Sequence, residues 1–99
     1  MVKKEEVMKA LEKVMDPEIG LNIVDLGLIY DVDVGMDGLV QINMTLTSPG
    51  CPIAPQLMTE VEERVTKIKG VKRTKVEFVF DPPWTPDKMS ASARMKLGI

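Results

Sequence analysis

Hydrophobic residues recur along the chain with two different spacings, which predict helices in some segments and strands in others. In residues 3–15, and again from residue 53 to about residue 69, they recur every three or four positions, the spacing of one face of a helix. Residues 28–34, 39–47 and 71–80 alternate apolar and polar side chains instead, as strands with one buried face do. The pattern therefore predicts two long helices and three strands before residue 81.

Individual residues set the boundaries of these elements. Pro17 is expected to end the first helix, which would place Asp16 at the negative end of the helix dipole. Gly70 is suited to end the second helix, since glycine readily adopts the backbone conformation found at helix ends. In the tail, Thr85 and Ser90 are suitable N-caps for short helical turns.

The alternation also predicts which strand side chains face the core. We expect Tyr30, Phe78 and Phe80 to point inward with their aliphatic neighbours. Thr45 and Thr47 fall on the polar side of the second strand. Each of the first two strands therefore has one core face and one polar face.

The element order is α-β-β-α-β-α, within a single domain over residues 1–99. A helix connects the second and third strands, so these two are expected to run parallel, with the first antiparallel to the second. The sequence predicts an α/β fold of the α+β type, with two layers and a three-stranded mixed sheet that has helices on one face. The order of the strands in the sheet is left open.

Composition excludes several classes of protein. With 44% hydrophobic and 28% charged residues, the chain has the composition of a globular domain, and no apolar run is long enough to span a membrane. The start turns acidic where a signal peptide would be apolar, so we expect a cytoplasmic protein. A pI near 5.1 and the absence of an aromatic platform argue against nucleic acid as a partner.

Histidine is absent and Cys51 is the only cysteine, which limits the available chemistry. The absence of histidine excludes catalytic triads and metal sites that need a histidine. A single cysteine excludes an internal disulfide, and it excludes a four-cysteine iron–sulfur site within one copy.

Cys51 is the first candidate for function. It lies at or just before the start of the second predicted helix, where unpaired N–H groups favour a thiolate and so a lower thiol pKa. Gly50 would let another molecule approach closely, and Thr47 and Ser48 add hydroxyl groups nearby. The alternative is a small buried hydrophobic residue, a common role for a free cysteine.

Two further groups of residues are candidates for the same site. Asp16 and Glu18 flank Pro17 on a tight turn, and a carboxylate there is suited to act as a base for the thiol, or simply to shape the turn. Trp84 either covers part of the core or folds over the thiol, in which case it would bring Ser90 or Arg94 to the site.

Three segments, taken in order, resemble the SufT/PaaD-like family of metal–sulfur cluster biosynthesis proteins, which is related to the iron–sulfur cluster assembly domain. They are DPE at 16–18 followed by VDLGLIY at 24–30, MTLTSPGCP at 44–52, and FDPPWTP at 80–86 with the following Met89 and Ser90.

This resemblance implies a non-enzymatic maturation factor that carries or targets a labile iron–sulfur cluster, or its precursor, to client apoproteins. Its partners would be those client apoproteins and the assembly scaffold proteins. The resemblance also implies that Cys51 is the reactive cysteine and that Asp16, Glu18, Thr47 and Ser48 line the site.

One thiolate cannot hold a cluster whose irons need four protein ligands. We therefore expect a homodimer or a transient complex with Cys51 near the contact, so that a cluster ligand is shared between chains.

Two alternative functions stay open. One is a non-catalytic adaptor in a multiprotein complex such as an oxygenase. It would recruit partners through an exposed face of the sheet or through the basic cluster Arg64, Lys67, Lys69, Lys72, Arg73 and Lys75. The other is a small thiol enzyme.

Overall fold

A three-stranded sheet organises the protein, which we describe from a computed structural model covering residues 2–17, 19–47 and 54–98. The strands are β1 (Ile29–Val34), β2 (Leu39–Met44) and β3 (Arg73–Phe78), and β2 lies in the middle of the sheet. β1 is antiparallel to β2, and β3 is parallel to β2. The predicted strand directions and the mixed sheet are confirmed.

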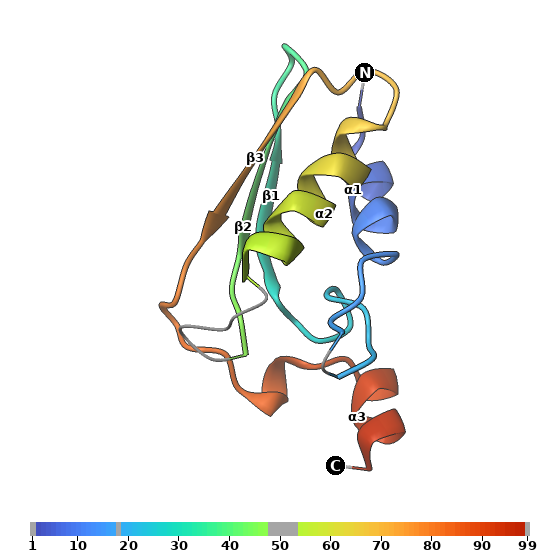
Figure 1. Cartoon of the computed structure of the whole chain (residues 1–99), viewed down its shortest axis with the longest axis vertical. Helices are drawn as coiled ribbons and strands as arrows, with labels where there is room; N and C mark the ends of the chain where they lie inside the picture. The colour runs from blue at the N-terminus through green and yellow to red at the C-terminus, as the bar shows by residue number, and fades with distance from the viewer. Residues whose placement is uncertain (1, 18, 48–53, 99) are drawn as a thin grey trace.

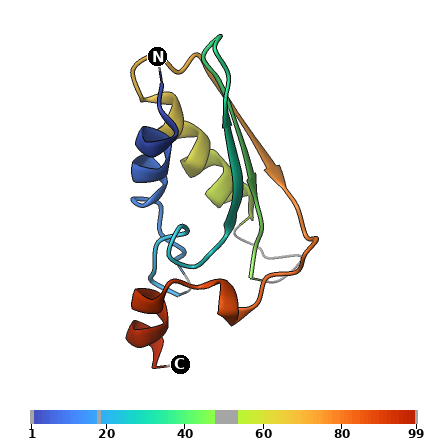
Figure 2. The same ribbon diagram turned by 180° about the vertical axis from the view of Figure 1, so that it is seen from behind.

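Two helices cover the same face of this sheet. α1 (Lys4–Leu11) and α2 (Ala54–Thr66) lie side by side against it, as Figures 1 and 2 show from opposite sides. The short helix η1 (Pro86–Lys88) and α3 (Ala91–Leu97) lie beyond one end of the sheet. The predicted α+β fold and its element order are confirmed, with the last helix placed at the end of the sheet. Among the described residues, no helix is long and apolar enough to cross a membrane.

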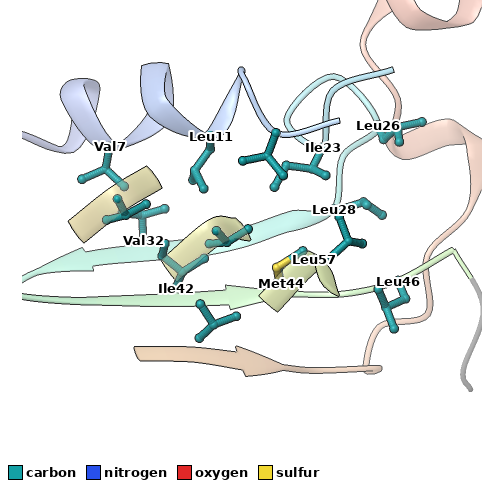
Figure 3. Close-up of a cluster of buried hydrophobic side chains, with 14 of the residues drawn as sticks. Val7, Leu11, Ile23, Leu26, Leu28, Val32, Ile42, Met44, Leu46 and Leu57 are labelled. Atoms are coloured by element: carbon teal, nitrogen blue, oxygen red, sulfur yellow. The ribbon is translucent and has the colours of Figure 1, made fainter. Parts of the chain in front are cut away.

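The core lies between the sheet and the two covering helices (Figure 3). α1 and α2 each contribute the apolar stripe that their sequence predicts, and the sheet contributes its alternate residues. The loop before β1 adds further aliphatic side chains. The fully buried large residues are Val7, Leu11, Val14, Ile23, Leu26, Leu28, Val40, Ile42, Met44, Leu57, Val61 and Val65.

The first helix is shorter than its apolar pattern predicts. It ends at Leu11, and not at Met15, because residues 14–16 pair instead with residues 21–23. The Ile23 N–H donates to the Val14 carbonyl at 3.0 Å, and the Asp16 N–H donates to the Leu21 carbonyl at 2.9 Å. The prediction that Asp16 lies at the negative end of the helix dipole is therefore wrong.

Three side chains of the sheet region also differ from the prediction. Tyr30 lies at a bulge between Ile29 and Asp31 and is not part of the buried core. Phe80 follows the end of β3 and is 44% exposed, so it does not face the core. Thr45, expected on the polar side, is fully buried. In each case the residue lies at or beyond the end of the regular ladder, where strict alternation no longer applies.

Candidate functional site

The structure describes part of the predicted site. Cys51, Glu18, Ser48 and Gly50 lie outside the described residues. Thr47, Trp84 and Ser90 are half-buried, Asp16 is 3% exposed, and Arg94 is exposed. We therefore describe the site from Asp16, Thr47, Trp84 and Ser90, and from the residues that contact them.

Sheet topology brings the relevant segments to one end of the molecule. Ile29 at the start of β1 pairs with Met44 at the end of β2, and Met44 pairs with Phe78 at the end of β3. The segments that enter β1 and leave β2 and β3 therefore share one end of the sheet (Figure 1). We call this the loop end and define it as residues 14–17, 19–28, 45–47 and 79–90.

The segment from Leu21 to Leu28 connects the parts of the loop end. Its shape is fixed locally by Asn22, whose Oδ1 accepts from the Asp25 N–H at 2.8 Å and whose Nδ2 donates to Asp25 Oδ2 at 3.0 Å. Its last carbonyl, at Leu28, accepts from the Thr45 N–H at 2.8 Å, which ties it to the chain leaving β2. A short turn with its own side-chain hydrogen bonds thus forms a fixed base for the loop end.

Asp16 shapes the turn that lies beside this segment. Its carbonyl accepts from the Gly20 N–H at 2.8 Å, and its Oδ1 accepts from the Ile19 N–H at 3.3 Å. The first is a backbone bond that any residue could accept, and the second is of the kind by which an aspartate side chain stabilises a turn. The structure thus gives Asp16 a role in holding the turn, as one of the two readings of the sequence predicts.

The Asp16 turn also lies against the beginning of α2. Met15 and Pro17, on either side of Asp16, line a cavity of about 200 Å³ together with Gln56, Leu57 and Glu60. These α2 residues follow closely on Ala54, where the described chain resumes after the segment bearing Cys51. Asp16 and the start of α2 are therefore brought to the same region, which the sequence alone left open.

Trp84 and Ser90 are both attached to the Leu21–Leu28 segment. The Trp84 Nε1–H donates to the Leu26 carbonyl at 2.7 Å, and its ring packs against the core. The Ser90 N–H donates to the Asp25 carbonyl at 2.8 Å. Ser90 Oγ accepts from the Ala93 N–H at 3.1 Å, so Ser90 is the N-cap of α3, as predicted. Both residues hold the C-terminal segment in place across the loop end.

Sequence reasoning did not identify a second group of residues at the loop end. An open cavity of about 520 Å³ is lined by Gly27, Ile29, Tyr30, Pro82 and Lys88. The Tyr30 hydroxyl donates to the Pro82 carbonyl at 2.8 Å, and Lys88 Nζ lies 5.1 Å from the centre of the Tyr30 ring. Of these residues, only Gly27 could have been noticed from the sequence, because a glycine is favoured where the backbone has a positive φ, here 78°.

Thr45 is a further residue that alternation misassigned. Its hydroxyl is buried and has no hydrogen-bond partner among the described residues. A buried hydroxyl without a partner is unusual in a folded protein. Thr45 lies two residues before Thr47, so this group lies where the chain leaves β2 toward Cys51.

The described side chains do not form a metal site by themselves. Within the described ranges, no group of three or more Asp, Glu, Cys or His residues is placed to hold a metal ion. The described residues of the loop end are instead joined to one another by the hydrogen bonds set out above.

Comparison with known proteins identifies related chains. Residues 4–78 match the family described as "Iron-sulfur cluster assembly protein". The chain is 55% identical over 96 residues to "Fe-S protein maturation auxiliary factor YitW" of Bacillus subtilis, covering 97% of this chain and 94% of that one. It is 45% identical to "Fe-S protein maturation auxiliary factor SufT" of Staphylococcus aureus, covering 87% of this chain and 98% of that one.

Two other relatives extend the comparison. The solved structure "Domain of Unknown Function DUF59 from Bacillus anthracis" matches with a TM-score of 0.93 at 39% identity, covering 97% of this chain and 92% of that one. An "Iron-sulfur cluster carrier protein" of Synechocystis is 30% identical over 99% of this chain, which corresponds to 27% of that longer protein. The fold and the resemblance stated from the sequence are thereby confirmed.

Proposed function

Because this chain belongs to the iron–sulfur cluster assembly protein family, we propose that it is an iron–sulfur protein maturation factor. The observation that carries the proposal is the match over residues 4–78 together with 55% identity to a relative named as a maturation auxiliary factor. Cys51 provides the working sulfur. The cluster, or its precursor, is the cargo that passes to client apoproteins.

The arrangement of the loop end supports this role for Cys51. The Leu21–Leu28 segment is bonded both to Asp16 and to Thr45, where the chain leaves β2, and the residues on either side of Asp16 line a cavity with the start of α2. A thiolate that binds iron with few other ligands of its own would hold a cluster weakly. Weak holding suits transfer to another protein and does not suit storage.

Transfer then proceeds by ligand exchange at iron. A client thiol gives up its proton and binds iron, the Cys51 sulfur leaves the iron, and the released proton ends on that sulfur. No electron moves in this step, so neither an oxidant nor a reductant is required. The remaining iron ligands come from the client or from a small thiol, and the protein acts as a carrier or targeting factor and not as a turnover enzyme.

The cytoplasm is the compartment that this chemistry requires. A single unpaired cysteine stays reduced there, whereas an oxidising compartment favours disulfides. Assembly scaffold proteins that supply the cluster and apoproteins that receive it are the partners in this proposal.

Anaerobic reconstitution with iron and sulfide tests the role of Cys51. The wild-type protein is expected to gain visible absorption, and Cys51→Ser is expected to lose it. Ser92→Ala is the control, because Ser92 is exposed on α3 outside the candidate site and the variant keeps the thiol. Equal absorption in Cys51→Ser and wild type would contradict ligation by Cys51.

A transfer assay separates the carrier from a pure adaptor. The reconstituted protein is mixed with an apoprotein whose activity depends on a cluster, and the recovered activity is measured. A carrier loses transfer in Cys51→Ala and keeps it when Lys72 and Arg73 are reversed to Glu. The opposite result, an active Cys51→Ala and an inactive charge-reversed variant, would identify the adaptor instead.

A further inference from the structure

β3 forms an edge of the sheet, and no described strand lies on its outer side (Figure 1). The Val79 N–H donates to the Met44 carbonyl of β2, so the odd-numbered residues in this part of the chain turn their backbone groups toward β2. Alternate residues of a strand turn these groups to opposite sides. The N–H and C=O groups of Thr74, Val76 and Phe78 therefore point outward, where a further strand can bind them.

The two edges of the sheet differ in regularity. β1 has a bulge between Ile29 and Asp31, which interrupts the even spacing of its backbone groups. β3 pairs with β2 without interruption over its whole length, from Arg73 to Phe78. Bulges protect a sheet edge from pairing, so β3 is the edge that is better prepared for a partner strand.

The charges on β3 are arranged for a second copy of the same strand. Lys75 and Glu77 are exposed, lie on the face of the sheet away from the helices, and flank the buried Val76. We propose that two copies pair antiparallel through β3, about a two-fold axis beside Val76. In this register Lys75 lies directly opposite Glu77 of the partner subunit, and the symmetry forms the same ion pair twice.

Neighbouring registers are disfavoured by the same charges. If one strand slides past the other, the outward-pointing groups pair again only after a shift of two residues. Such a shift moves the two-fold axis by one residue, from Val76 to Lys75 or to Glu77. A pair centred on Lys75 would place two lysines opposite each other, although it would also place Arg73 opposite Glu77 of the partner subunit twice. A pair centred on Glu77 would place two glutamates opposite each other. Like charges directly opposite destabilise a strand pair, whereas opposite charges stabilise it. Of these three registers, the one centred on Val76 is the only one that forms two ion pairs and places no like charges opposite each other, so we assign the pair to it.

The helix-facing side fits the same register. Val76 meets its own symmetry mate, and Thr74 lies opposite Phe78 of the partner subunit. Thr74 and Phe78 are half-buried in one copy, so a neighbouring strand would cover surface that is already partly apolar. Both faces of the strand pair thus have compatible side chains.

This dimer has a consequence for the working end of the protein. The two-fold axis reverses the strand direction, so the two loop ends lie at opposite ends of a six-stranded sheet. From the strand spacing and the rise per residue, the two Met44 residues would be roughly 20 Å apart, with the chains that follow running away from each other. Each copy would therefore present its own loop end, in contrast to our expectation from the sequence that Cys51 lies near the contact.

Charge exchange tests the register. Sedimentation over a concentration series is expected to show dimer formation by the wild-type protein. Lys75→Glu is expected to raise the dimer dissociation constant about tenfold or more, because both ion pairs become repulsive. The double variant Lys75→Glu/Glu77→Lys restores both pairs with reversed sign and is expected to restore the dimer. Lys69→Glu is the matched control, since it makes the same charge change at an exposed site outside β3.

Two results of this series would overturn the proposal. One is a wild-type protein that stays monomeric throughout, which would mean that the edge charges only prevent pairing. The other is a dimer that Lys75→Glu does not weaken or that the double variant does not restore.

A distance measurement gives an independent test if a charge variant fails to fold. Met36, 90% exposed at the tip of the β1–β2 hairpin, is replaced by cysteine and spin-labelled in a Cys51→Ala background. The β3 dimer predicts roughly 30 Å between the two labels, from strand spacing and rise. A dimer joined through its loop ends would place the tips farther apart than the 41 Å length of one copy, and that result would overturn the proposal.

Discussion

Gly27 allows the backbone at Lys88 to approach the segment before β1 closely, and replacing it with alanine tests how tightly these two segments pack. Its φ is 78°, and a Cβ atom at this position would overlap the Lys88 carbonyl oxygen. The backbone conformation costs an L-residue about 1–2 kcal/mol, of which about 0.4–1 kcal/mol is regained because alanine restricts the unfolded chain. The overlap adds about 1–3 kcal/mol, because the backbone of η1 must move to relieve it.

Gly20→Ala is the matched control for this substitution. Gly20 has nearly the same φ, 80°, but no atom of the described residues lies within 4 Å of the position its Cβ would occupy. Gly20→Ala therefore reports the cost of the backbone conformation alone, about 1.6 kcal/mol or less. We expect Gly27→Ala to lower the free energy of unfolding by about 1–5 kcal/mol, and the difference between the two variants, about 1–3 kcal/mol, measures the close approach to Lys88.

Urea unfolding of both variants provides the measurement. Trp84 is the only tryptophan, and its indole N–H donates to the Leu26 carbonyl next to Gly27, so its fluorescence reports on this contact directly. Gly27→Ala is expected to change the fluorescence of the folded protein, and Gly20→Ala is not. Equal losses of stability in the two variants would refute the close packing of residue 27 against Lys88.

Three other substitutions have expected outcomes in the same unfolding assay. Trp84→Phe leaves the Leu26 carbonyl without its 2.7 Å donor and should cost about 1–3 kcal/mol; an unchanged midpoint would count against this bond. Ser90→Ala removes the N-cap of α3 and should cost about 1 kcal/mol, whereas Ser90→Asp, which caps equally well, should cost little. Leu11→Ala opens a cavity in the core and should cost about 2–5 kcal/mol, and a loss below 1 kcal/mol would contradict its full burial.

The elements of this fold were accessible from the sequence because they depend on local pattern. The stripe through Val7 and Leu11, the alternation through Val40 and Ile42, and the cap at Ser90 each involve residues a few positions apart. Parallel strands joined by a helix, and the antiparallel hairpin before them, follow from connection length. These predictions were confirmed.

Errors arose where a distant segment changed the local preference. The first helix stops at Leu11 because residues 14–16 find backbone partners at residues 21–23, which no helical pattern reveals. Tyr30 leaves the regular alternation because a bulge lies beside it, and its hydroxyl reaches Pro82, 52 residues further along the chain. Apolar periodicity describes one face of one element and cannot show such contacts.

For the candidate site, the sequence by itself determined which groups are available: a single thiol at Cys51, no histidine, and carboxylates and hydroxyls in nearby turns. Only the tertiary structure decided that Asp16, Trp84 and Ser90 all attach to the Leu21–Leu28 segment at one end of the sheet. The physical reason is that composition and spacing fix the chemistry of each side chain, whereas convergence depends on hydrogen bonds and packing between residues far apart in the sequence, such as Leu26 and Trp84.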